Sequence, residues 1–144
     1  MSTVAFMVPG QPQGKGRPRI GRVAGHARMF TPAKTASYES TIALFAHQAM
    51  QGRPLLAGPV QVDLWLVYGI PASWSKKKRA QAEQGAIWPT TKPDVDNVVK
   101  AYCDAINKVV WVDDAQVVKL RADKAYGDAP GVQVLVSALV EVAQ

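Results

Sequence analysis

The sequence predicts an α+β fold, in which a mostly antiparallel mixed sheet is flanked by two or three helices within one small domain. The length of 144 residues is the usual size of a single domain and leaves little room for a second, so we expect one domain over residues 1–144. Segments with the apolar alternation of strands are separated by segments with apolar residues at helical spacing, and no internal repeat is visible. Together these patterns indicate a sheet covered by helices.

Four segments read as strands: 4–8, 60–68, 117–126 and 132–140. The second alternates apolar and other residues in the manner of a half-buried strand. The last is apolar on both faces, which is typical of a strand that is central in its sheet or covered by a partner. A turn of glycine and proline residues at 127–131 separates the last two segments.

Three segments read as helices. The first begins with Thr31 as the N-cap and Pro32 in its first turn, runs to about Gln51, and has a core face. That face consists of apolar residues at helical spacing: Tyr38, Ile42, Phe45 and Ala49. A second, short helix over 74–84 is expected to be capped by Ser73.

The third helix is expected to run from Asp94, its N-cap, to about Lys108. Its apolar positions fall on one face, and its polar positions fall on the other. Between the first strand and the first helix, residues 11–19 form a loop that presents positive charge, and 20–30 form a hairpin or an irregular arm.

The charge is unevenly distributed along the chain. Residues 1–92 carry 12 Lys/Arg against 3 Asp/Glu, whereas residues 93–144 carry 5 Lys/Arg against 8 Asp/Glu, and the net charge is +6. A basic body with one acidic segment suits a nuclease, because cations bind the phosphate backbone and clustered carboxylates bind a metal ion. Ordinary charge scatter explains the same numbers equally well.

Other features exclude several classes of protein. A single cysteine, Cys103, cannot form an internal disulfide, so we expect a reducing, cytoplasmic setting. No apolar run approaches the length of a membrane span, and the N-terminus lacks the pattern of a signal peptide. His26 and His47 do not pair with cysteines at zinc-ligand spacing, and no P-loop is present, so we expect neither zinc nor a nucleotide cofactor.

Acidic residues mark a candidate metal site around the third helix. Asp94 and Asp96 fall at its first turn, where the helix dipole stabilises negative charge, and Lys100 follows one turn later. The apolar run 109–112 then ends in Asp113 and Asp114, and the strand that follows can aim one of them back at the helix start. Carboxylates from two elements are suitable ligands for Mg²⁺, which prefers oxygen.

Such a metal site would activate a water molecule and neutralise charge at a scissile phosphate, while a lysine beside it adds stabilisation. Each carboxylate alone has a simpler structural explanation, as a cap, a dipole partner or an exposed turn residue. Spacing alone leaves the metal site and the structural reading about equally supported.

Residues 92–100, Lys-Pro-Asp-Val-Asp-Asn-Val-Val-Lys, are followed by Asp104-Ala105-Ile106 and by residues 111–117, Trp-Val-Asp-Asp-Ala-Gln-Val. This pattern closely resembles the motif of RusA-like Holliday-junction resolvases, including the phage and prophage type. The layout matches over about residues 4–142, and the specific part covers residues 93–117.

The resemblance implies a RusA-like fold and a homodimer that binds four-way DNA junctions and nicks two opposing strands symmetrically with Mg²⁺, for which Mn²⁺ can substitute. It implies catalytic roles for Asp94, Asp96, Asp114 and Lys100, and metal binding by the three aspartates with Asp113 as a less critical neighbour. The chain departs from the best-known member in its longer, more basic N-terminal loop and in the basic run 76–79, which leaves junction specificity open.

Basic residues outside the motif are candidates for contacts with DNA phosphates. They lie in the N-terminal loop, in the short second helix and at the start of the motif: Lys15, Arg17, Arg19, Lys76, Lys77, Lys78, Arg79 and Lys92. For the helical run, a solvated surface is an equally good explanation. The tryptophans are expected in the core or at a dimer contact, with base stacking as a minor alternative for Trp74 or Trp88.

Two other functions remain open from the sequence. One alternative to a resolvase is a junction-binding recombination accessory without catalysis, and the other is a metal nuclease for flaps and other branched DNA. In the first case the carboxylates would serve only as caps and turn residues.

Overall fold

The computed structural model describes residues 2–16, 19–30 and 33–140. Its strands, in chain order, are β1 (Thr3–Pro9), β2 (Arg19–Val23), β3 (His26–Phe30), β4 (Val60–Gly69), β5 (Val117–Gly127) and β6 (Gly131–Ala138). Its helices are α1 (Ala33–Met50), α2 (Lys76–Glu83), α3 (Val95–Ile106) and the short 3₁₀ helix η1 (Asp114–Gln116). The predicted α+β class is confirmed.

Four strands form one mixed sheet in the order β1-β6-β4-β5. The β1–β6 and β4–β6 pairings are antiparallel, and β4–β5 is parallel. The parallel pair is possible because the chain between β4 and β5 crosses over through α2 and α3. β6 lies between β1 and β4, so its central position explains why it is apolar on both faces.

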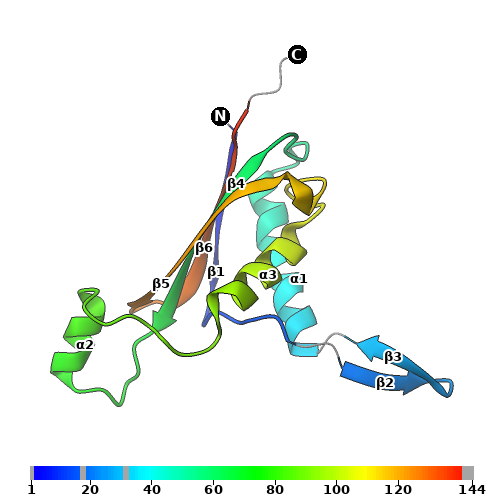
Figure 1. The fold of residues 1–144 in the computed structure, drawn as a ribbon. Helices are drawn as coiled ribbons and strands as arrows, with labels where there is room; N and C mark the ends of the chain where they lie inside the picture. The colour runs from blue at the N-terminus through cyan, green and yellow to red at the C-terminus, as the bar shows by residue number, and fades with distance from the viewer. Residues whose placement is uncertain (1, 17–18, 31–32, 141–144) are drawn as a thin grey trace.

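Helices α1 and α3 pack together on the same face of the sheet (Figure 1). The core between helices and sheet includes the buried side chains Val62, Leu64 and Leu66 of β4. The buried hydroxyls of Tyr38 and Tyr102 are 2.6 Å apart and join α1 to α3 within this core. None of the helices in the described part of the chain has the length and apolarity needed to cross a membrane.

Residues 20–30, for which the sequence predicted a hairpin or an irregular arm, form a hairpin. Strands β2 and β3 pair antiparallel as a separate two-stranded sheet that extends away from the main body (Figure 1). The predicted cap at Thr31 and Pro32 lies outside the described residues.

Helix α2 begins later than the sequence predicts, and the expected cap at Ser73 is wrong. The Trp74 N–H donates to the Pro71 carbonyl at 3.2 Å, which makes residues 71–74 a turn. Ser75 is the true N-cap, because its hydroxyl accepts a hydrogen bond from the Lys78 N–H at 3.2 Å. The predicted end at about Gln84 is close to the observed C-cap.

Candidate functional site

Two carboxylates lie at the beginning of α3, as predicted. Asp94 occupies the N-cap position and its carbonyl accepts the Val98 N–H at 3.2 Å, but its side chain makes no capping hydrogen bond. Asp96 lies in the first turn, and both residues are exposed. Because the Asp94 carboxylate is not used as a cap, it remains available for a ligand.

The residues just before α3 are held by the end of β4. The hydroxyl of Tyr68 donates to the Pro93 carbonyl at 2.6 Å. Burial, and secondarily the negative charge of Asp94, raises the pKa of Tyr68 to about 12. Tyr68 therefore stays a protonated donor at neutral pH and sits within electrostatic reach of the Asp94 carboxylate.

The N-terminal loop packs directly on the same segment. A Cβ added to Gly14 would lie 3.1 Å from the Cβ atoms of both Pro93 and Asn97, so a larger residue would push these neighbours apart by a few tenths of an ångström. The backbone N–H of Lys15 donates to the Asn97 carbonyl at 3.2 Å. The motif segment 93–97 is thus held between β4 and the N-terminal loop.

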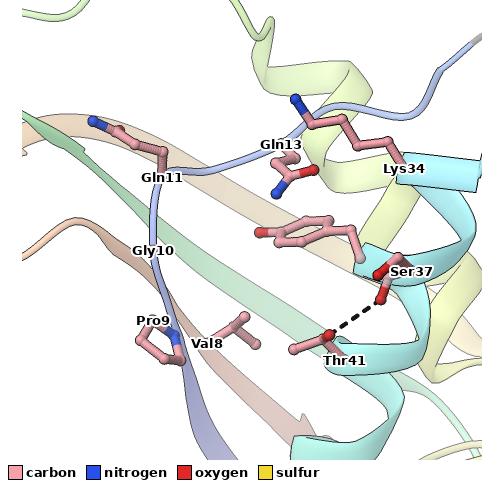
Figure 2. A pocket seen from close by; sticks show the side chains of 9 residues that line it. Val8, Pro9, Gly10, Gln11, Gln13, Lys34, Ser37 and Thr41 are labelled. Carbon is pink, nitrogen blue, oxygen red and sulfur yellow. Dashed lines mark hydrogen bonds between the residues drawn. The ribbon is translucent and has the colours of Figure 1, made fainter.

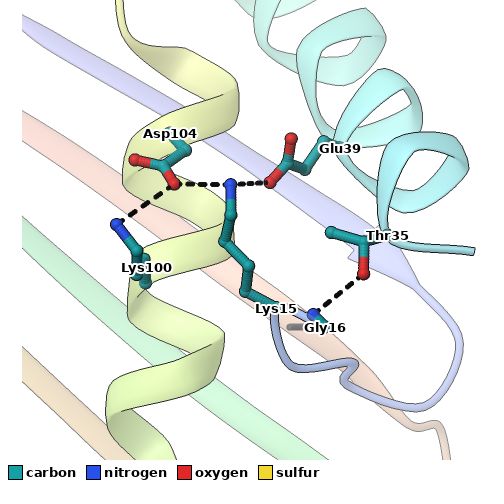
Figure 3. Close-up of polar contacts among 6 residues, drawn as sticks. All are labelled: Lys15, Gly16, Thr35, Glu39, Lys100 and Asp104. Carbon is teal, nitrogen blue, oxygen red and sulfur yellow. Dashed lines mark hydrogen bonds and ion pairs between the residues drawn. The ribbon is translucent and has the colours of Figure 1, made fainter. Parts of the chain in front are cut away.

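Lys15 was a candidate for DNA binding, but the structure places it inside the protein's own ion-pair network (Figure 3). Its ammonium lies 2.8 Å from a Glu39 carboxylate oxygen and 2.7 Å from an Asp104 oxygen, and the side chain is 22% exposed. Partial burial lowers the pKa of Lys15, but hydrogen bonds to Asp104 and Glu39 outweigh burial and leave the pKa raised. Its charge is therefore already neutralised by residues of α1 and α3, which argues for a structural role.

Lys100 is placed as the motif predicts. It lies one turn after Asp96 on α3, its side chain is 64% exposed, and its ammonium is 3.5 Å from Asp104. The same Asp104 oxygen therefore contacts both Lys15 and Lys100 (Figure 3). Asp104 was not among the predicted site residues, although its i,i+4 spacing from Lys100 could have indicated the contact.

Asp113 and Asp114 have structural partners in a single chain. Asp113 caps η1, accepting the Ala115 N–H at 3.2 Å, and the Asp113 N–H donates to the Gln116 side chain at 2.9 Å. Asp114 accepts a hydrogen bond of 2.9 Å from the indole N–H of Trp111, whose ring is fully buried. Sequence spacing did not reveal this bond.

The predicted convergence of three aspartates is not seen within one chain. Among the described residues, no three His, Cys, Asp or Glu side chains lie together so as to hold a metal ion. The charge of Asp114 instead affects Cys103. Burial is the main reason that the pKa of this thiol is raised to about 11, and the charges of Asp114 and Asp104 add to the effect. Cys103 belongs to the later half of α3, so the charge of Asp114 reaches that part of the helix.

The donor set at the start of α3 nevertheless suits one kind of metal. Mg²⁺ is commonly bound by one or two carboxylates, with water and substrate phosphate oxygens completing its shell. Asp94 and Asp96 supply such a pair. The pair therefore fits Mg²⁺, whereas the full triad does not form within a single chain.

Among the other basic candidates, some side chains are exposed and others contact groups within the protein. Lys76, Lys77 and Lys92 are exposed. The Lys78 ammonium lies 3.9 Å from the centroid of the Trp74 ring, and the Arg79 guanidinium donates to the Pro71 carbonyl at 3.2 Å. Arg17 lies outside the described residues, and Arg19 is the first residue of β2.

Gln11, in the described part of the N-terminal loop, contributes to two pockets. One, of about 380 Å³, lies between the end of β1 and α1, with Lys34, Ser37 and Thr41 on its helix side (Figure 2). The other, of about 470 Å³, is lined by residues from the ends of β4 and β5 and by Pro93, beside Asp94. Sequence analysis identified neither pocket.

Comparison with known proteins shows the family of the chain. The family model described as "Endodeoxyribonuclease RusA" matches residues 9–137. A Bacillus subtilis (strain 168) protein named "Uncharacterized protein YqaN" is 41% identical over 138 residues, which cover 94% of this chain and 96% of that protein. The match includes the whole segment from the N-terminal loop to β6, so the chain belongs to the RusA family of endodeoxyribonucleases.

Proposed function

We propose that this protein is a Mg²⁺-dependent, structure-selective endonuclease that resolves Holliday junctions by paired, symmetrical nicks. We place its action in recombination or repair of phage or prophage DNA in the bacterial cytoplasm, where that DNA is found. The observation that carries the proposal is the exposed pair Asp94 and Asp96 at the start of α3, with the exposed Lys100 one turn later. Family membership supplies the reaction class, which is cleavage of DNA within a strand.

Each residue of this group has a distinct role. When bound, Mg²⁺ supplies activation of the attacking water and neutralisation of charge on the phosphate, and Mn²⁺ is expected to substitute. Asp94 and Asp96 hold the ion, with the helix N-terminus behind them to stabilise their charge. The Lys100 ammonium stabilises the additional negative charge that develops on the phosphate in the transition state.

Symmetrical cleavage requires two sites, and therefore a homodimer. Strand β5 is an edge of the sheet, and its apolar residues Val118 and Leu120 are 59% and 51% exposed, which supports a contact there. β5 also packs against α3, so a second chain at this edge would lie near the helix that carries the site. One chain supplies two ligands, Asp94 and Asp96. A second chain would add a further carboxylate to this set, with Asp114 and its neighbour Asp113 as the candidates. Sedimentation tests the dimer directly.

The decisive experiment uses a labelled four-way junction with and without Mg²⁺. We expect Asp96→Asn to bind the junction as the wild type does but to lose at least about 100-fold in nicking rate, since a ligand that acts on the transition state has been removed. Asp128→Asn, which changes an exposed aspartate in the β5–β6 turn, is the matched control and should cleave normally. Full cleavage by Asp96→Asn would refute the assignment.

One observation favours the alternative of a non-catalytic junction-binding accessory, namely that no three-acid group forms within the described part of one chain. In that case the wild type would shift the junction in a gel and leave it uncut at every Mg²⁺ concentration. A panel of flaps, forks and junctions separates a resolvase from a nuclease for other branched DNA. Equal cleavage of flaps and junctions would favour the latter.

A further inference from the structure

An aromatic pocket lies beside the predicted metal ligands. Tyr68 and Tyr126 are paired in register at the carboxyl ends of β4 and β5, and both line the pocket of about 470 Å³. Trp74 forms a third wall, with its ring centroid 5.2 Å from that of Tyr126 and an interplanar angle of 70°. Pro93 also lines it, so the pocket adjoins Asp94.

Three lysines lie beside these rings. Lys92 is part of the lining, and the Lys78 ammonium lies 3.9 Å from the Trp74 ring centroid. The Lys124 ammonium lies 4.8 Å from the Tyr68 ring centroid and donates to the Thr91 carbonyl at 2.7 Å. All the lining residues are described, and none is acidic. The chemistry therefore suits a flat, aromatic ligand that carries negative charge, as a nucleotide does.

A purely structural explanation is that these rings only hold α2 against the sheet. Well-packed aromatic clusters leave few voids larger than a water molecule. Here the rings border a pocket that is open to solvent, and its volume falls within the range of about 300–1,000 Å³ that is usual for small-molecule sites. The walls are thus arranged around a space of ligand size.

We propose that this pocket binds one unpaired nucleobase of the DNA strand whose phosphate lies at Asp94 and Asp96. The inference rests on the proposed function and adds a physical basis for selecting branched DNA. In an intact duplex every base is paired and stacked, so extracting one costs free energy. At a branch point that cost is smaller. The pocket would favour DNA in which a base next to the cleaved bond is free to leave the stack.

The test pairs a change in the protein with a change in the DNA. Abasic sites are placed one at a time at the nucleotides flanking the branch point, and binding of wild type and Trp74→Ala is measured by fluorescence anisotropy without divalent cations. At one position we expect the abasic site to weaken wild-type binding by about 5- to 150-fold, the usual range for one base stacked on an aromatic ring. On the intact junction, Trp74→Ala should bind more weakly than the wild type by a similar factor. On that abasic junction, Trp74→Ala and the wild type should bind with equal affinity.

Three controls separate this outcome from indirect effects. Trp88→Ala changes a 64%-exposed tryptophan that does not line the pocket, and should bind like the wild type. Trp74→Phe keeps an aromatic face and should recover most of the affinity. An abasic site on the complementary nucleotide breaks the same base pair but removes the other base, and should not weaken binding.

The inference is refuted if no abasic position weakens wild-type binding, or if the effects of Trp74→Ala and of the abasic site multiply independently at every position. Because the abasic scan is made with unmodified protein, it stands even if Trp74→Ala misfolds. Failure of the proposed function looks different: the wild type would then leave a junction uncut in Mg²⁺. A protein that cleaves junctions but is insensitive to every abasic site would refute the pocket alone.

Discussion

Replacement of Lys15 by methionine tests whether this lysine belongs to the fold or to the DNA-binding surface. In the structure its ammonium donates to Glu39 at 2.8 Å and to Asp104 at 2.7 Å. Charge-assisted hydrogen bonds contribute about 1.5–3 kcal/mol each, but all three side chains remain between 21% and 29% exposed and the carboxylates can regain water. We therefore expect a total loss of about 2–3 kcal/mol in the free energy of unfolding.

This loss is measurable by urea denaturation followed by circular dichroism. For a domain of this size, about 2–3 kcal/mol corresponds to a fall of about 4–12 °C in Tm. Lys119→Met, at an exposed position of β5, is the matched control and should change stability by no more than about 0.5 kcal/mol. If Lys15→Met were as stable as the Lys119 control, the ion-pair network would have no structural role and the reasoning would be wrong.

The raised pKa of Lys15 also predicts how its contribution to stability depends on pH. The pKa of Lys15 is raised in the folded protein above its ordinary value of 10.5. The stability that it contributes is therefore fully present below pH 10.5 and is lost as the pH rises through the raised pKa. The difference in stability between wild type and Lys15→Met should be constant near neutral pH and should shrink in strongly alkaline buffer.

Three further results are expected. Lys77→Gln should reduce the slope of log Kd for DNA against log salt by about 0.9, whereas Lys15→Met should leave it unchanged because its charge is already paired; equal slopes for wild type and Lys77→Gln would remove Lys77 from the DNA surface. Cys103, whose pKa is raised to about 11, should react with a thiol reagent at pH 8 on the order of 100-fold more slowly than a free cysteine, and a fast reaction would contradict its burial. Trp111→Phe should weaken Mn²⁺ binding in titration calorimetry by about 10- to 100-fold if Asp114 ligates the ion, since its orienting hydrogen bond is lost; unchanged affinity would limit Asp114 to a structural role.

Much of the fold could be predicted from periodicity. The alternation in 60–68 and the helical spacing after Asp94 identified β4 and α3, because both elements bury one face and expose the other. The apolar pattern of the last strand predicts either a central strand or one covered by a partner; the strand is central, so it is no longer evidence for a dimer. The cap of α2 was missed because Ser73 and Ser75 are equally good N-caps in isolation, and only the turn at residues 71–74 decides between them.

The candidate site was only partly predictable, because spacing identifies residues but not their partners. Asp94, Asp96 and Lys100 share one helix, so helical geometry fixes their relation. Asp114 belongs to another element, and its orientation depends on a hydrogen bond to a buried indole that no local pattern encodes. Lys15 looked like a free cation for a similar reason, since its partners lie 24 and 89 residues away in the chain.

The position of Asp114 connects the structural and functional questions. Within one chain its charge acts on Cys103 of α3, and its carboxylate accepts a hydrogen bond from Trp111. A carboxylate with a buried donor and an open side is typical of an oriented ligand, because outer partners fix the ligand before the metal arrives. Under the proposed function, association of two chains comes first and tight metal binding second, because the second chain brings the remaining carboxylate. Mn²⁺ affinity should accordingly rise with protein concentration across the dimerisation range, and an affinity independent of concentration would place the whole site on Asp94 and Asp96 of one chain.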